Sequence, residues 1–221
     1  MEPGKSRIFD TILGRLNLRF PLRYAISDRS SFPGLTHSEY LRLLFETSAN
    51  LIQLREKDLT IRQLRPLVRQ GVKQASERGK IFLVNGNAPL ALEEGAEGVH
   101  LTSSQSVAEA VLRRREADQP EFLVGRSVHS GDAARQAAEE GADYLLLSPV
   151  LRPLSKKDRR APLGIRTLER IVREVPVPVF SLGGMTLDRL PLMESIGAAG
   201  IAGISWASQE ATKRLQSPAQ E

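Results

Sequence analysis

The chain has 221 residues, of which 41% are hydrophobic, so a single domain with a sizeable core is possible. It has no cysteine, which excludes a disulfide framework, a thiolate metal site and a cysteine nucleophile, and we expect a cytoplasmic protein. The formal net charge of +5 favours an anionic partner, but only 5% of the residues are aromatic, which leaves little for single-stranded bases to stack on. A small phosphorylated ligand explains the charge as well as nucleic acid does.

The chain begins with an amphipathic segment, residues 1–22, which lacks the apolar h-region of a signal peptide. It is an extra helix or a flexible lead-in, and it either caps the fold or packs on a partner. We expect one domain over residues 23–215, followed by a frayed tail at 216–221. Since no apolar run is long enough to span a bilayer, no membrane association is expected.

Eight short runs between residues 23 and 205 read as strands. Several are apolar throughout, which is typical of parallel strands buried on both faces. The longer stretches between them are amphipathic and read as helices, with Thr36 and Thr60 as N-caps and Gly141 as a helix end. The predicted strands are residues 23–27, 50–55, 80–85, 98–101, 122–128, 143–149, 178–184 and 200–205.

This alternation predicts an α/β fold, a (β/α)8 TIM barrel with an N-terminal extra segment. A doubly wound open sheet is the alternative, but it usually has fewer strands, and no Gly-x-Gly-x-x-Gly follows the first strand. In a TIM barrel the active site lies at the carboxyl ends of the strands, so the residues there are the candidates for ligand binding.

Glycines follow the last two strands, in SLGGMT and GIAGIS. Glycine lets backbone N–H groups approach an anion, and a helix that begins there adds its positive end. A tight turn would explain one such loop, but two on adjacent strands favour a phosphate site. The predicted phosphate-binding residues are Gly183, Gly184, Gly203, Ile204 and Ser205.

Cationic and polar residues follow other strands. Gln53, Arg55 and Lys57 alternate along one strand end, so they point to the same face, the interior of a barrel or its mouth. The basic loop at residues 151–164 is either an ordinary solvated loop or a mobile lid over an anionic substrate, and Lys156 is its strongest candidate.

One of the three histidines stands out. His129 follows a strand end beside the predicted phosphate site, and its ordinary pKa near neutrality suits proton transfer. His100 also ends a strand and suits a core residue with satisfied hydrogen bonds, and His37 starts a helix on the surface.

The chain resembles the thiamine phosphate synthase/TenI superfamily from about residue 23 to residue 205. The motifs that carry the resemblance occur in the family's order and at compatible spacings. They are YAISD, IQLREKD, VNGN, GVHL, VGRSVHS, ADYLLLSPV followed by SKK, LGGMTLDRL and GIAGIS.

The resemblance implies one of two activities. The synthases join hydroxymethylpyrimidine diphosphate to thiazole phosphate and use Mg²⁺ held partly by two aspartates, whose positions are Gly86 and Gln105 in this chain. The TenI-like tautomerases aromatise a thiazole carboxylate phosphate without a metal, using a histidine that matches His129. Since neither Gly86 nor Gln105 offers a carboxylate, we expect the tautomerase, with no metal and no other cofactor.

In this interpretation the partner is a phosphorylated thiazole. Asn85 and Ser127 would orient its ring, and Arg55, Lys57 and Lys156 would neutralise its charge. The alternatives are a synthase with a rearranged metal site, a non-catalytic ligand-binding or regulatory protein, and, last, a nucleic-acid binder. Barrels of this kind often dimerise, so a homo-oligomer is also open.

Overall fold

Eight parallel strands pair in chain order and close into a barrel, in the computed structural model, which describes residues 6–152 and 160–216. The predicted (β/α)8 barrel is confirmed, and the open sheet is excluded. The strands are β1 (Leu22–Ile26), β2 (Leu51–Leu54), β3 (Ile81–Asn85), β4 (Gly98–Leu101), β5 (Leu123–Val128), β6 (Tyr144–Leu147), β7 (Val179–Ser181) and β8 (Gly200–Gly203).

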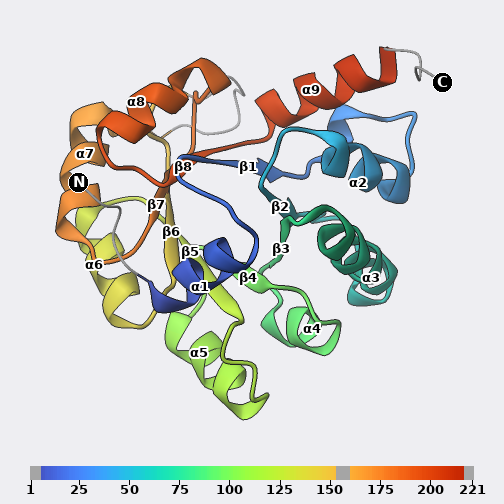
Figure 1. The fold of residues 1–221 in the computed structure, drawn as a ribbon, viewed down its shortest axis with the longest axis horizontal. Coiled ribbons are helices and arrows are strands. Elements are labelled where there is room, and N and C mark those ends of the chain that lie inside the picture. The colour runs from blue at the N-terminus through green and yellow to red at the C-terminus, as the bar shows by residue number, and fades with distance from the viewer. Residues whose placement is uncertain (1–5, 153–159, 217–221) are drawn as a thin grey trace.

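Helices surround the ring of strands, as Figure 1 shows. Two 3-10 helices, η1 (Arg29–Ser31) and η2 (Leu187–Arg189), follow β1 and β7. The α-helices are α1 (Arg7–Arg15), α2 (His37–Glu46), α3 (Ile61–Arg78), α4 (Ala88–Glu93), α5 (Val107–Glu116), α6 (Gly131–Glu139), α7 (Ile165–Glu174), α8 (Leu190–Ser195) and α9 (Ser205–Gln216).

The helix ends follow local sequence signals. Thr36 and Thr60 cap α2 and α3 as predicted, and each takes part in a capping box with the residue three positions later. Gly141, directly after the cap of α6, has a φ of 96° and ends the helix. These helix ends depend only on neighbouring residues, so they could be predicted from the sequence.

Three predicted strands are too long by two or three residues at their carboxyl ends. The strand predicted at 143–149 ends at Leu147, and that at 178–184 ends at Ser181, because Gly183 and Gly184 have φ angles of 94° and 64° and leave the extended conformation. The strand predicted at 200–205 ends at Gly203, because α9 begins at Ser205. The lost residues form loops at the carboxyl end of the barrel, where a ligand would bind.

Helix α1 closes the amino end of the barrel. Phe9 is fully buried, and its ring centroid lies 5.7 Å from that of Tyr144 at the start of β6 and 6.1 Å from that of Phe180 in β7. Phe9 and Ile12 belong to one buried cluster with side chains that fill the barrel interior. Within the amphipathic N-terminal segment, Arg7–Arg15 thus form a helix that caps the barrel, and Figure 1 shows α1 lying across the ring of strands.

A buried carboxylate ties α1 to the sheet. Asp143, just before β6, accepts a hydrogen bond from the Ser6 hydroxyl at 3.2 Å. It also forms an ion pair with Arg114 at 2.7 Å. It also accepts the backbone N–H of Val124 at 2.8 Å. Because burial disfavours its charged form, the pKa of Asp143 is raised even though Arg114 opposes the shift.

The barrel closes where β8 meets β1. Leu22 pairs with Gly200, and a methyl group at Gly200 would overlap the backbone carbonyl of Leu22. Gly200 also has a φ of 146°. Only glycine allows this approach without moving one of the two strands.

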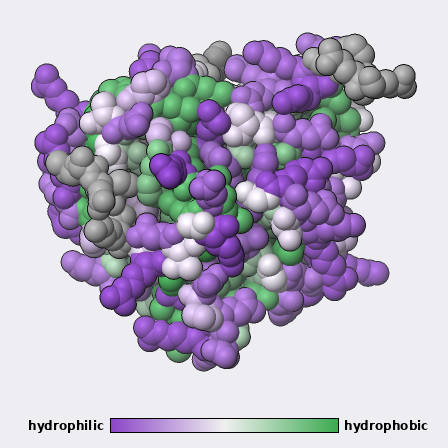
Figure 2. Space-filling view, viewed as in Figure 1, coloured by the Kyte–Doolittle hydropathy of each residue, from purple (hydrophilic) through white to green (hydrophobic). Residues whose placement is uncertain are grey.

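The outer surface is mostly hydrophilic on the face that Figure 2 shows, with hydrophobic residues visible mainly near its middle. Within the described ranges, none of the helices combines the length and the apolar character that a membrane crossing needs.

Candidate active site

A chain of hydrogen bonds crosses the barrel interior, and both of its ends lie near the carboxyl ends of strands. We call it the interior hydrogen-bond chain. Half of its members were predicted from the sequence as substrate-binding residues, and the others were not. In order, its members are Asn85, Gln53, Tyr24, Tyr144, His100 and Ser127.

The first half of the interior hydrogen-bond chain joins β3, β2, β1 and β6. Gln53 Nε2 donates to Asn85 Oδ1 at 2.8 Å, and the Tyr24 hydroxyl donates to Gln53 Oε1 at 2.9 Å. The hydroxyl oxygens of Tyr24 and Tyr144 are 3.1 Å apart. Burial raises the pKa of both phenols, so both stay protonated.

His100 forms the second half. Its Nδ1 lies 3.1 Å from the Tyr144 hydroxyl, and its Nε2 lies 2.9 Å from Ser127 Oγ. Burial, assisted by the positive charge of Arg55, lowers the pKa of His100 from 6.5 to about 3. His100 is therefore a neutral core residue with both ring nitrogens hydrogen-bonded.

The buried His100 makes stability depend on pH. It is neutral in the folded protein but takes up a proton on unfolding below its ordinary pKa, so the free energy of unfolding is expected to fall as the pH drops from 6.5 toward about 3. Between pH 7 and pH 4 this group alone would account for about 3 kcal/mol. Urea denaturation at both pH values measures the change. His100→Gln, which cannot titrate, should show a smaller change by that amount, and equal changes in both proteins would contradict the assignment.

The two predicted cations of β2 differ in position. Arg55 is half-buried, and its charge acts on His100, which places it at the mouth of the barrel. Lys57 is exposed. Lys156, the third predicted cation, lies outside the described residues.

His129 follows β5, two residues beyond Ser127, and is half-buried. Its Nδ1 lies 2.7 Å from the backbone carbonyl oxygen of Ser148, next to β6. Because a carbonyl oxygen can only accept, Nδ1 carries the hydrogen, and neutral His129 keeps its lone pair on Nε2. His129 is thus held by one nitrogen and can accept a proton at the other.

The loops that follow β7 and β8 carry backbone N–H groups without an acceptor among the described residues. Gly183 and Gly184 press against residues 149–152, and a Cβ at Gly184 would lie 2.6 Å from the Arg152 carbonyl oxygen. Among the described residues, none accepts a hydrogen bond from the backbone N–H of Gly183, Gly184, Ile204 or Ser205. The N-terminus of α9 lies at Ser205, so its dipole adds positive potential there. Close packing explains the glycines, and the amides remain available to an anion.

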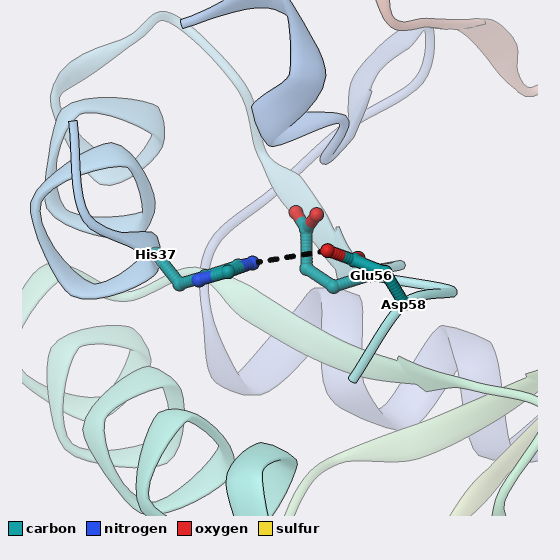
Figure 3. Close-up of side chains that lie close together, drawn as sticks. All are labelled: His37, Glu56 and Asp58. Carbon is teal, nitrogen blue, oxygen red and sulfur yellow. Dashed lines mark ion pairs between the residues drawn. The ribbon is translucent and has the colours of Figure 1, made fainter. Parts of the chain in front are cut away.

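A group of three ionisable side chains lies outside this mouth, at the carboxyl ends of β1 and β2. Figure 3 shows His37 beside Glu56 and Asp58, with His37 Nε2 3.9 Å from Asp58 Oδ2. Within the described part of the chain it is the one such group spaced for a metal ion. However, Arg29 Nε donates to His37 Nε2 at 3.0 Å, so that nitrogen already has a partner. We assign no metal to it.

Comparison with known proteins decides the family. A family model described as thiamine monophosphate synthase matches residues 23–207. The chain belongs to the thiamine monophosphate synthase family. The thiamine-phosphate synthases of Methanoculleus marisnigri and Methanoregula boonei are 37% and 36% identical over 183 and 182 residues, which is 82% of this chain in both cases and 85% and 83% of those proteins.

A solved structure agrees with the thiamine monophosphate synthase assignment. The thiamine phosphate pyrophosphorylase from Pyrococcus furiosus matches with a TM-score of 0.71 and 27% sequence identity, covering 89% of this chain and 96% of that protein. The resemblance seen in the sequence motifs is thereby confirmed at the level of the superfamily. None of these three relatives bears the name of a tautomerase, so their names favour the synthase alternative over the activity expected first.

The two positions at which the sequence resemblance implies metal ligands hold neutral groups in this chain. Gln105 Nε2 donates to the Gly86 carbonyl oxygen at 2.7 Å. Gln105 Oε1 accepts the backbone N–H of Thr102 at 3.0 Å and the Thr102 hydroxyl at 3.1 Å. Mg²⁺ prefers carboxylate oxygens, and these two positions supply none. The residues at the expected site therefore do not fit Mg²⁺.

Proposed function

We propose that this chain is an enzyme of thiamine biosynthesis that binds a phosphorylated thiazole at the carboxyl end of the barrel. The observation that carries the proposal is the pair of loops after β7 and β8, whose free N–H groups at Gly183, Gly184, Ile204 and Ser205 face no acceptor among the described residues. Gly203 precedes them at the end of β8. Amides at a helix N-terminus are a common phosphate site.

The names of the relatives favour the synthase reaction, in which a hydroxymethylpyrimidine diphosphate is joined to the thiazole phosphate. Gln53, Asn85 and Ser127 would position a ring at the mouth of the barrel, and Arg55, Lys57 and Lys156 would attract the anionic groups. No step of this reaction is assigned to Mg²⁺, since Gly86 and Gln105 do not fit the ion.

The tautomerase is the second candidate, and the Gly86–Gln105 hydrogen bond favours it. The tautomerase needs a group that removes a proton from a ring carbon and returns one elsewhere. His129 suits this role, because its Nδ1–H is fixed on the Ser148 carbonyl and no residue in the described ranges bonds to its Nε2, which can accept a proton.

One pair of assays separates the two. The protein is incubated with both synthase substrates and Mg²⁺, and thiamine phosphate is sought; in parallel, the thiazole carboxylate phosphate tautomer is followed by NMR. Thiamine phosphate formation supports the synthase, and tautomer conversion supports the second candidate. Turnover in neither assay, with thiazole phosphate binding seen by calorimetry, would leave a binding protein. Failure to bind would end the proposal.

EDTA is expected to leave the rate of tautomer conversion unchanged, because the residues at the expected metal positions offer no carboxylate. The measurement is the NMR rate before and after chelation, with Mg²⁺ added back as the control. A large loss that Mg²⁺ restores would mean that a metal binds elsewhere and takes part.

A further inference from the structure

The interior hydrogen-bond chain has a direction that its chemistry fixes. A hydroxyl group has one hydrogen and a neutral imidazole has one N–H, so each group that donates to one neighbour must accept from the next. The direction of a single link therefore determines all the links that follow.

The amide of Gln53 supplies that link. Its Nε2 donates to Asn85 Oδ1, so its Oε1 faces Tyr24. An amide oxygen only accepts, so the Tyr24 hydroxyl donates to it and has no hydrogen left for Tyr144. The Tyr144 hydroxyl must then donate to Tyr24 across their 3.1 Å contact.

The same reasoning continues through the histidine. With its hydrogen directed at Tyr24, the Tyr144 oxygen can only accept from His100, so Nδ1 of His100 carries the hydrogen. His100 is neutral, because its pKa is far below its ordinary value. Its Nε2 is therefore an acceptor, and the Ser127 hydroxyl donates to it.

We infer that the interior hydrogen-bond chain runs in one direction, from Ser127 to Asn85, and that His100, as its Nδ1–H tautomer, is a positioning residue that fixes the Ser127 hydroxyl. The hydrogen of Ser127 then points at His100, and its oxygen lone pairs are left for a ligand. At the other end Asn85 Oδ1 is occupied, and no described residue accepts from its Nδ2.

The direction has a consequence for specificity. The side of the mouth formed by β5 presents a hydrogen-bond acceptor, and the side formed by β3 presents a donor. The ligand class that fits is a heteroaromatic ring with a donor for Ser127 and an acceptor for Asn85. If the interior hydrogen-bond chain ran the other way, β5 would present the donor and β3 the acceptor. The ligand part of this inference rests on the proposed function, but the tautomer does not.

The tautomer is tested directly in the ligand-free protein labelled with ¹⁵N. Long-range ¹⁵N–¹H spectra distinguish a protonated from an unprotonated ring nitrogen, and His37→Gln and His129→Gln variants assign the three rings. The expected result is a hydrogen on Nδ1 of His100 and none on Nε2, at acidic and at neutral pH. A hydrogen on Nε2 would reverse the chain and overturn the inference, whatever the enzyme's activity.

The action through Ser127 is tested by a double-mutant cycle with hydroxymethylpyrimidine diphosphate as the probe, because its ring carries an amino donor for Ser127 and ring-nitrogen acceptors for Asn85. His100→Ala and Ser127→Ala are each expected to weaken binding about three- to tenfold, the usual effect of one lost hydrogen bond. The double variant should bind no more weakly than Ser127→Ala alone, and His100→Gln should restore part of the affinity. Losses that simply multiply would show that His100 does not act through Ser127. If the wild-type protein does not bind hydroxymethylpyrimidine diphosphate, the synthase candidate and the ligand part of the inference fail, while the spectra still decide the tautomer.

Discussion

Replacing His129 by alanine is expected to slow tautomer conversion by about 10²–10⁴-fold, the usual contribution of general acid–base catalysis. The ring is held through Nδ1 on the Ser148 carbonyl, which leaves Nε2 as the proton acceptor. Binding of thiazole phosphate should persist, because the backbone amides near Gly184 and Ser205 are untouched. NMR measures the conversion, and calorimetry measures the binding.

Two further variants sharpen the His129 prediction. His129→Gln keeps a donor for the Ser148 carbonyl but cannot take up a proton, so it should be as slow as His129→Ala. His37→Ala removes a histidine at the start of α2, in the separate cluster with Glu56 and Asp58, and should leave turnover unchanged. Full activity in either His129 variant would remove His129 from the mechanism.

Truncating Phe9 to alanine is expected to lower the free energy of unfolding by about 3–5 kcal/mol, as for other buried aromatic residues. The Phe9 side chain has no exposed surface and packs against the rings of Phe20, Tyr144 and Phe180. Its loss would leave a cavity between α1 and the amino end of the barrel. Urea denaturation followed by circular dichroism measures the change.

The matched control for Phe9 is Leu112→Ala on the outer face of α5. The Leu112 side chain is 53% exposed, so its removal should change stability by no more than about 0.5 kcal/mol. A Phe9→Ala variant that lost no more than this would show that α1 docks loosely and that the barrel interior holds without its cap.

The fold was predictable because its signals are local and repeated. Buried parallel strands are apolar throughout, and eight such runs separated by amphipathic stretches leave few architectures open. The N-caps Thr36 and Thr60 needed only the residue three positions later. By contrast, amphipathicity made the N-terminal segment, residues 1–22, either an extra helix or a flexible lead-in. It could not say which surface an apolar face there covers, since Phe9 packs on residues more than a hundred positions away.

The candidate site was predictable only in part. Gln53, Asn85 and Ser127 stand near strand ends, where a barrel builds its active site, so position alone identified them. Tyr24 lies in the middle of β1 and Tyr144 at the start of β6, and no neighbouring residue indicates that their hydroxyls meet across the barrel. A buried tyrosine needs a partner for its hydroxyl, but only the closed barrel shows which one.

The reaction is the part that residue patterns left open. His129 and the missing carboxylates at Gly86 and Gln105 led to a tautomerase, whereas the relatives are named as synthases. The Gly86–Gln105 hydrogen bond explains how the chain keeps this region ordered without acidic residues. It does not by itself supply either reaction, so assays must decide between them.

The pairing of β8 with β1 also determines when the barrel can close during synthesis of the chain. Leu22 must wait for Gly200 before its strand has neighbours on both sides, and Ser6 must wait for Asp143. During translation β1 thus keeps one unpaired edge until β8 has been synthesised. Partners so distant in sequence make folding slow, and β8 is the strand that closes the barrel on β1.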